Sequence, residues 1–302
     1  MSGLMAAESS AADKRAALRA GLASGRLQRL PGAFNPLVAK LIQRLGFEGV
    51  YVSGAVISAE LALPDIGLTT LSEVAERGRV ISRVTDLPTL IDADTGFGEP
   101  MNAARTITLL EEAGVAGAHL EDQVNPKRCG HLDGKTVVPT GEMVRRIRAA
   151  VSARRDPDFV ICARTDARAI EGLGAAIDRA KAYADAGADL IFTEALADAA
   201  EFAAFRAAVD VPLLANMTEF GKSELLSAGQ LQELGYNAVI HPVSTLRLAM
   251  YAVESGLREI ASTGTQSGLL ERMQHRSRLY ELLDYPRYNE FDSSIFTYTP
   301  SE

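Results

Sequence analysis

The chain has 302 residues, of which 47% are hydrophobic and 23% are charged, and its formal net charge is −8. These proportions exclude a disordered or collagen-like chain, and the negative charge argues against a broad basic face for nucleic acid or an anionic membrane. Two cysteines, Cys129 and Cys162, are too few for a disulfide scaffold. No apolar run reaches the roughly 18–20 residues of a transmembrane helix, and the N-terminus does not resemble a secretory signal, so we expect a cytoplasmic protein.

One pattern recurs along the chain: a helical segment ends in glycine, and a short apolar run and then polar residues follow it. The pattern predicts buried parallel strands at 45–54, 113–122, 186–194 and 234–242. Further apolar runs predict strands at 26–34, 87–94, 158–166 and 211–216. Strands that alternate with amphipathic helices in this number indicate the α/β class and a (β/α)₈ barrel. A doubly wound open sheet is the alternative, but the chain lacks the glycine-rich turn that binds dinucleotides.

The C-terminal residues exceed what a barrel needs. We interpret 1–302 as a single barrel domain in which the eighth strand ends near His241, so that 263–302 are left over. A helical stripe in this tail consists of Leu269, Leu270, Met273, Leu279 and Leu282. The stripe predicts an oligomerisation arm, and the alternative is a helix that lies across its own barrel.

Polar residues stand at the C-terminal ends of most of the predicted strands, where barrel enzymes carry their active sites. They are Tyr51, Ser53, Asp92, Asp94, His119, Glu121, Arg164, Asp166, Glu194, Asn216 and His241. Asp92 and Asp94 point to the same side of a strand end, and Glu121 adds a third carboxylate. Hard oxygen ligands favour Mg²⁺, with Mn²⁺ as a second option, over zinc. The motif is weak by itself, because Asp94 as a loop cap and Asp92 paired with an arginine would give the same pattern.

The segment Lys127-Arg128-Cys129-Gly130-His131 follows the fourth predicted strand in a long loop that contains several glycines and prolines. Such loops act as mobile lids in many enzymes. Positive neighbours lower the pKa of a thiol, so Cys129 is a candidate acid or nucleophile, and a buried structural cysteine is the alternative. Cys162 lies in an apolar strand, and we expect it in the core.

KRCGH, together with IDADTGFG, HLEDQ, ARTDA and NMTEFG, resembles the isocitrate lyase/phosphoenolpyruvate mutase superfamily from about residue 15 into the tail, and KRCGH resembles its lyase branch in particular. The resemblance implies a barrel whose last helix is exchanged between subunits, usually in a homotetramer. It implies Mg²⁺ at Asp92 and Asp94, with Glu121 nearby or bound through water, and Asp65 as a further acidic position. A small tricarboxylate would bind to Ser53, Gly54, Ala55, Lys127, Gly130, His131, Arg164, Glu194, Asn216, Thr218 and Arg247, and to the tail residue Arg276.

The implied activity is cleavage of 2-methylisocitrate to pyruvate and succinate, a step of propionate catabolism through the methylcitrate cycle. Phe192 and Ile240 occupy positions that shape the pocket and look closer to the methylisocitrate type than to the isocitrate type. Isocitrate and dimethylmalate-type acids stay open as substrates, since one methyl group provides only roughly 1–3 kcal/mol of discrimination. Cys129 would be the general acid. Tyr51 is the first candidate for the base, and a metal-linked carboxylate is the second. One departure from the superfamily is Ala55, where a glycine is common.

Overall fold

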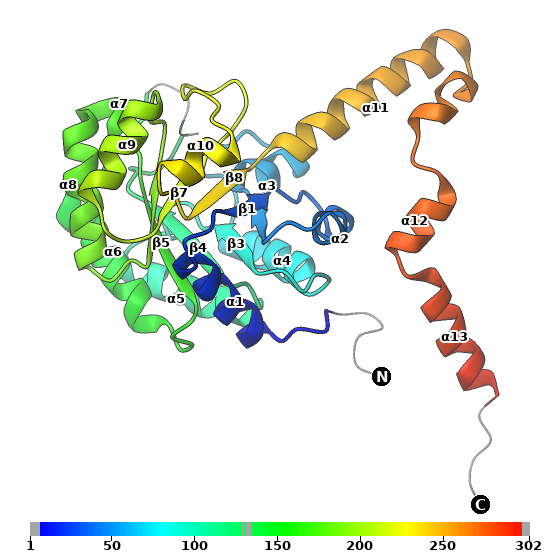
Figure 1. Ribbon diagram of the computed structural model, residues 1–302, viewed down its shortest axis with the longest axis horizontal. Coiled ribbons are helices and arrows are strands. Elements are labelled where there is room, and N and C mark those ends of the chain that lie inside the picture. Colours follow the sequence, from blue (N-terminus) through cyan, green and yellow to red (C-terminus); the bar gives the residue numbers. More distant parts are fainter. Residues whose placement is uncertain (1–6, 129, 131–133, 298–302) are drawn as a thin grey trace, which may run out of the picture.

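The computed structural model describes residues 7–128, 130 and 134–297. Its centre is a sheet of eight parallel strands that pair in the order β1-β8-β7-β6-β5-β4-β3-β2 (Figure 1). The strands are β1 (Gln28–Pro31), β2 (Val50–Val52), β3 (Thr89–Asp92), β4 (Gly117–Glu121), β5 (Val160–Thr165), β6 (Leu190–Thr193), β7 (Leu213–Asn216) and β8 (Ala238–His241). Each lies within a range predicted from the sequence. The (β/α)₈ barrel is therefore confirmed, and the open doubly wound sheet is excluded.

The barrel closes where β1 ends. A parallel bridge joins Gly32 to Tyr51, and the Ala33 amide donates to the Tyr51 carbonyl at 2.9 Å. On the other side, a Cβ at position 32 would lie 2.0 Å from the carbonyl oxygen of Pro242. Only glycine permits this approach, so Gly32 lets β1 join both of its neighbours.

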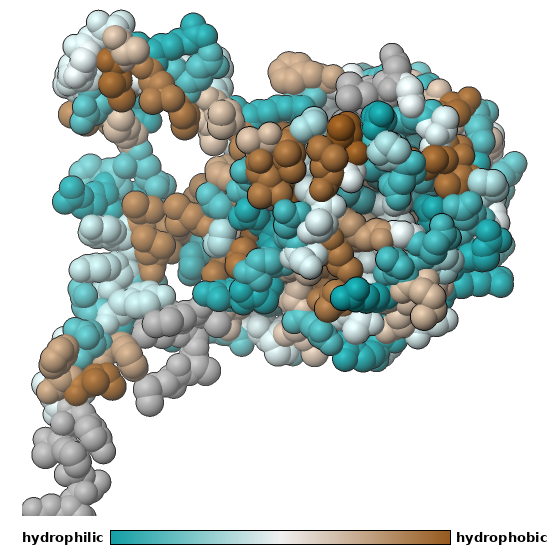
Figure 2. Space-filling model, turned by 180° about the vertical axis from the view of Figure 1, so that it is seen from behind, coloured by the Kyte–Doolittle hydropathy of each residue, from teal (hydrophilic) through white to brown (hydrophobic). Residues whose placement is uncertain are grey.

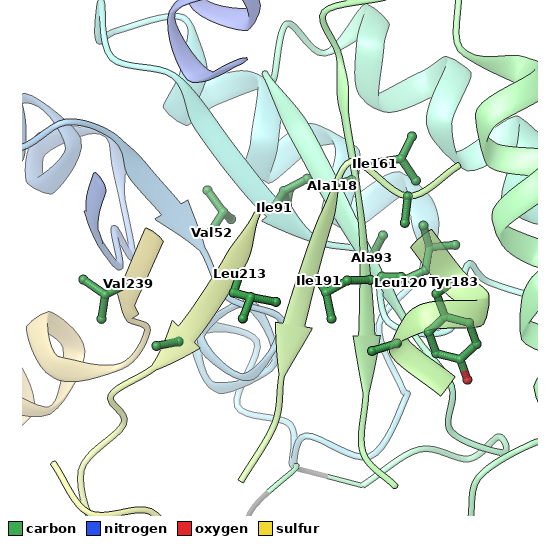
Figure 3. Packing of buried hydrophobic residues seen from close by; sticks show 14 of the residues in the cluster. Val52, Ile91, Ala93, Ala118, Leu120, Ile161, Tyr183, Ile191, Leu213 and Val239 are labelled. Atoms are coloured by element: carbon green, nitrogen blue, oxygen red, sulfur yellow. The ribbon is translucent and has the colours of Figure 1, made fainter. Parts of the chain in front are cut away.

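Helices surround the strands and form the outer layer of the barrel (Figure 1). They are α2 (Pro36–Arg44), α3 (Gly54–Glu60), α4 (Leu71–Ser82), α5 (Pro100–Glu112), α6 (Thr140–Ala153), α7 (Arg168–Glu171), α8 (Leu173–Asp185), α9 (Ala199–Ala208) and α10 (Ala228–Glu233). Strand residues that point outward, such as Val52, Ile91 and Ile191, pack in the layer between strands and helices (Figure 3). Alternate residues form a second cluster, which includes Cys162, so the expectation that Cys162 belongs to the core is confirmed.

Helix α1 (Ala11–Ala23) covers the N-terminal end of the barrel. Arg15 donates to the carbonyls of Val115 and Glu111 at 3.2 and 2.6 Å, and the buried Lys14 donates to the carbonyl of Ser82 at 2.7 Å. All three carbonyls lie in chain segments that lead into strands. The opposite end, where the strands finish, is thereby left for the active site.

The C-terminal segment leaves the barrel. Helix α11 (Ser244–Thr263) projects away from the strands, and η1 (Ser267–Arg272), α12 (Arg276–Leu282) and α13 (Tyr285–Phe296) follow it (Figure 1). No α11 residue is buried, and apolar side chains gather on the protruding segment (Figure 2). Helix α12 returns to α2 through an Arg44–Glu281 ion pair of 3.1 Å. In the predicted stripe, Leu269 and Leu282 are buried whereas Leu270 and Met273 are exposed. The protruding part thus begins with α11, ahead of residue 263.

Over the described part of the chain, no helix has the length and apolar character that crossing a membrane requires.

Candidate active site

A cavity of about 230 Å³ opens at the C-terminal ends of the strands. Most of the residues predicted from the sequence line it: Tyr51, Ser53, Ala55, Asp65, Asp92, Lys127, Gly130, Arg164, Phe192, Glu194, Asn216, Thr218, Ile240 and Arg247. Asp94 and Glu121 are buried beside them. Arg276 begins α12 and is not among the lining residues. Cys129 and His131 lie outside the described residues.

Two carboxylates crowd together at the end of β3. The Asp92 carboxylate accepts from the amides of Gly54 and Asp94 at 3.1 and 3.0 Å. A Cβ at Gly54 would lie 2.8 Å from an Asp92 oxygen and 3.2 Å from an Asp94 oxygen. Asp94 itself adopts a φ of 46°, a left-handed conformation that is uncommon outside glycine. The strained backbone of Asp94 therefore places its carboxylate close to that of Asp92, with both beside Gly54.

Lys127 supplies a cation to this acidic point. Its ammonium lies 2.8 Å from Asp94 Oδ1 and 2.6 Å from Asp65 Oδ1, and the Lys127 side chain is only 3% exposed. Burial raises the pKa of Asp94 to about 6, against the pull of Lys127. The pKa of Asp92 is lowered to about 2, because positive neighbours outweigh its burial. The role of Lys127 as a substrate ligand stays a prediction. In the structure, its ammonium group neutralises these acids.

The donor set fits a partly hydrated divalent cation. Asp92 and Asp94 provide hard oxygens, and Glu121 Oε1 is buried without a hydrogen-bond partner among the described residues. In that same part of the chain, no group of three or more His, Cys, Asp or Glu side chains converges in the way that a site built of protein ligands alone requires. Mg²⁺ is commonly held by one or two carboxylates with water as the remaining ligands. The arrangement at Asp92 and Asp94 suits that pattern.

Arg164, at the end of β5, is surrounded by acids. Its guanidinium binds Asp166 through two nitrogens at 2.9 and 3.1 Å, and it lies 3.2 Å from Glu121 and 3.5 Å from Glu194. It also stacks over the Phe192 ring, 4.9 Å from the ring centroid. Burial raises the pKa of Glu121 well above its usual value, although Arg164 opposes the shift. Arg164 is therefore held in a fixed orientation at the cavity wall.

Tyr51 and His119 form a buried pair under the cavity. The Tyr51 hydroxyl is 2.7 Å from His119 Nε2, and the same nitrogen is 3.6 Å from an Asp92 oxygen. Burial, and then the charge of Asp92, raise the pKa of Tyr51 well above 10. Burial lowers the pKa of His119 to about 4. Tyr51 is thus a neutral hydroxyl beside a neutral imidazole at neutral pH.

The loops after β7 and β8 supply the other wall. Arg247, near the start of α11, donates to the Glu219 carboxylate at 2.7 Å, to the Glu219 carbonyl at 2.8 Å and to the Thr218 hydroxyl at 3.4 Å. The Asn216 amide donates to Glu194 at 3.2 Å. Glu219 was not predicted from the sequence, although it lies inside the NMTEFG motif next to Thr218.

Hydrogen bonds join the described ends of the loop after β4 to each other. Val124 and Thr136 pair through a 2.9 Å backbone hydrogen bond, and the Gln123 amide exchanges two hydrogen bonds of 2.8 Å with the backbone of Arg128. Gly130 lies deep in the site: a Cβ there would be 2.0 Å from Glu194 Oε1 and 2.3 Å from Arg164 Nη2. Any larger residue at position 130 would require the loop backbone or the ends of the Glu194 and Arg164 side chains to move.

Proteins similar to this chain belong to one enzyme superfamily. The family described as phosphoenolpyruvate phosphomutase matches residues 18–261. The chain belongs to the phosphoenolpyruvate mutase/isocitrate lyase superfamily. It is 68% identical over 299 residues to a probable 2-methylisocitrate lyase 2 of Corynebacterium glutamicum, with 99% of this chain and 97% of the relative covered. It is 50% identical over 265 residues to 2-methylisocitrate lyase of Aeropyrum pernix, with 88% and 85% covered. The resemblance found in the sequence motifs is confirmed.

A solved structure bears on the metal. The chain is similar to phosphonopyruvate hydrolase in complex with oxalate and Mg²⁺, with a TM-score of 0.84, 32% identity, and 93% of this chain and 98% of that chain covered. A superfamily member thus carries a divalent metal, which agrees with the donor chemistry of Asp92 and Asp94.

Proposed function

We propose that the protein is a carbon–carbon lyase that cleaves 2-methylisocitrate to pyruvate and succinate. The observation that carries the proposal is the cavity itself, which is lined by three cationic side chains, Lys127, Arg164 and Arg247. Each of them is paired with a carboxylate of the protein, and the carboxylates of a substrate would bind beside these pairs. Such cations suit a substrate with three carboxylates, and a divalent metal beside them suits its α-hydroxy acid group. The similarity to proteins named 2-methylisocitrate lyase supports the choice of substrate.

Asp92 and Asp94 would hold Mg²⁺, with Glu121 reaching it directly or through water, and Mn²⁺ would suit the same oxygens. When bound, the ion polarises the substrate's 2-hydroxyl and its neighbouring carboxylate and lowers the pKa of that hydroxyl. The buried Glu121 oxygen that lacks a partner among the described residues supports this placement.

Tyr51 is our candidate for the group that takes the hydroxyl proton. Because its own pKa is raised, it works as a relay: it accepts the substrate proton while it passes its phenolic proton to His119 Nε2, 2.7 Å away. The imidazolium that forms would be stabilised by the Asp92 carboxylate at 3.6 Å. The electron pair of the O–H bond then forms the keto group of pyruvate as the C–C bond breaks.

The electron pair of the broken C–C bond stays on the succinate half, which is then a carbanion stabilised by its neighbouring carboxylate. Arg164 and Arg247 line the cavity where this charge develops, and His131 is a further candidate from the sequence. Cys129 then donates its thiol proton to the carbanion, which completes succinate. The role of Cys129 as the acid is supported by its neighbour in the chain, Gly130, which lies against Arg164 and Glu194.

The protruding apolar segment supports a homo-oligomer. Leu248, Tyr251 and Leu257 of α11 are 72%, 74% and 60% exposed. Apolar patches of this kind on a soluble chain mark interfaces between proteins. We propose that α11 and the predicted arm at 263–302 pack on a neighbouring copy in a tetramer, whose mass light scattering after gel filtration would report.

The direct test is pyruvate release from 2-methylisocitrate by protein that was stripped with EDTA, before and after Mg²⁺ is restored. We expect activity only with the metal. Stripped protein that releases pyruvate at the full rate would contradict the metal assignment, and reloaded protein that releases none would contradict the proposed reaction.

A further inference from the structure

Lys135 connects two parts of the site that are far apart in the chain. It stands near the end of the loop after β4, and its side chain is only 2% exposed. The ammonium group lies 2.8 Å from Asp166 Oδ1, just past the end of β5, and it also donates to the Gly130 carbonyl. A buried ammonium with a carboxylate and a carbonyl as acceptors is a strong and directional contact.

Asp166 binds both Lys135 and Arg164. Its carboxylate accepts from two Arg164 nitrogens at 2.9 and 3.1 Å while it binds Lys135, and its amide donates to Asp122 at 2.9 Å. Arg164 and Lys135 together keep the pKa of Asp166 below its usual value despite full burial. Asp166 is therefore a fixed anion between two cations, one from the barrel and one from the loop.

Gly130 is the other end of the connection. Its α-carbon packs against Arg164 and Glu194 so closely that a methyl group would not fit. Packing alone does not hold a glycine in place, because it has no side chain to anchor. The Lys135 ammonium supplies the anchor, since it binds the Gly130 carbonyl and the carboxylate of Asp166, which is itself held in place just past the end of β5.

We propose that Lys135 is a positioning residue for the reaction: it fixes the Gly130 backbone against Arg164 and Glu194, two side chains that line the cavity. The inference rests on the proposed function for its link to catalysis, and on the contacts of Lys135 alone for its link to Gly130.

The first test compares Lys135→Met with a matched control. Lys14→Met removes a second buried lysine that donates to a backbone carbonyl, at the opposite end of the barrel. We expect Lys135→Met to lower kcat about 100-fold, the effect of a displacement near 1 Å at a reacting group, with little change in KM. Lys14→Met should lower the unfolding midpoint and leave kcat within about twofold of the parent.

The second test separates a positioning role from a stabilising one. In Lys135→Ala, n-propylammonium replaces the missing part of the side chain, and we expect it to restore kcat in a saturable manner without affecting the parent enzyme. A kcat for Lys135→Met within threefold of the parent would overturn the proposal. A second result would also overturn it: a large loss of kcat in Lys135→Ala that propylammonium does not reverse, together with a lower unfolding midpoint of that variant.

The third test does not depend on the substrate. Amide hydrogen exchange in peptides that cover 125–138 should become faster in Lys135→Met, whereas peptides of α4 should exchange as in the parent. If the parent enzyme proves inactive on 2-methylisocitrate, the proposed function fails, and faster exchange at 125–138 still supports the anchoring of Gly130. Unchanged exchange there would overturn the Lys135 proposal even in an active enzyme.

Discussion

Gly130→Ala is the substitution for which the structure gives the clearest magnitude. The added methyl would lie 2.0 Å from Glu194 Oε1 and 2.3 Å from Arg164 Nη2, where an ordinary contact needs 3.4 Å. Either the loop backbone or both side chains must therefore move by more than 1 Å. A displacement of that size at a reacting group costs about 100-fold in rate, or roughly 2.7 kcal/mol of transition-state stabilisation.

Steady-state pyruvate release measures this effect, with Gly141→Ala as the control. Gly141 has no atom within 4 Å of an added Cβ and lies in the first turn of α6, so alanine there should leave kcat/KM unchanged. Gly130→Ala should keep its unfolding midpoint within a few degrees, since the strain is local. A Gly130→Ala enzyme within threefold of the parent would show that the Gly130 backbone does not lie against Arg164 and Glu194 during turnover.

Three further predictions concern the proton donor Cys129, the metal site and the pH dependence of the unfolding free energy. Cys129→Ser should lose most of kcat while succinate still binds by calorimetry, and near-normal turnover would rule out the thiol as the acid. Asp92→Asn should abolish the rise in thermal stability that Mg²⁺ gives the parent, about 2.7 kcal/mol at 100 times Kd, and an unchanged rise would place the metal elsewhere. His119 has a pKa of about 4 when folded and about 6.5 when unfolded, so only the unfolded chain binds its proton between these values. The unfolding free energy of metal-free protein should therefore fall by roughly 3 kcal/mol as pH drops from 6.5 to 4. Denaturant titrations of His119→Gln should show a shallower fall, and parallel curves would contradict the assignment.

The barrel was predictable because its signals are local. A glycine past the preceding helix marks four of the strands, as at Gly114 and Gly187, and a short apolar run alone marks the other four, regardless of what the strands pack against. The barrel topology then places the polar strand ends at one mouth, which is why Asp92, Arg164 and Glu194 could be predicted from the sequence.

The connections between those side chains were not predictable. Lys135 contacts Asp166 across 31 positions of sequence, and no periodicity marks such a pair. The same holds for Lys127 with Asp65, and for Arg247 with Glu219. The outward course of α11 was also missed, because an apolar stripe looks the same whether it faces its own barrel or another subunit.

The central claim is tested most directly by kcat/KM for 2-methylisocitrate and for isocitrate, measured side by side on the Mg²⁺-loaded protein. We expect a preference for 2-methylisocitrate of roughly 10–200-fold, the range that one methyl group provides in a pocket such as that lined by Phe192 and Ile240. Equal or higher kcat/KM for isocitrate, or no pyruvate from 2-methylisocitrate, would contradict the account.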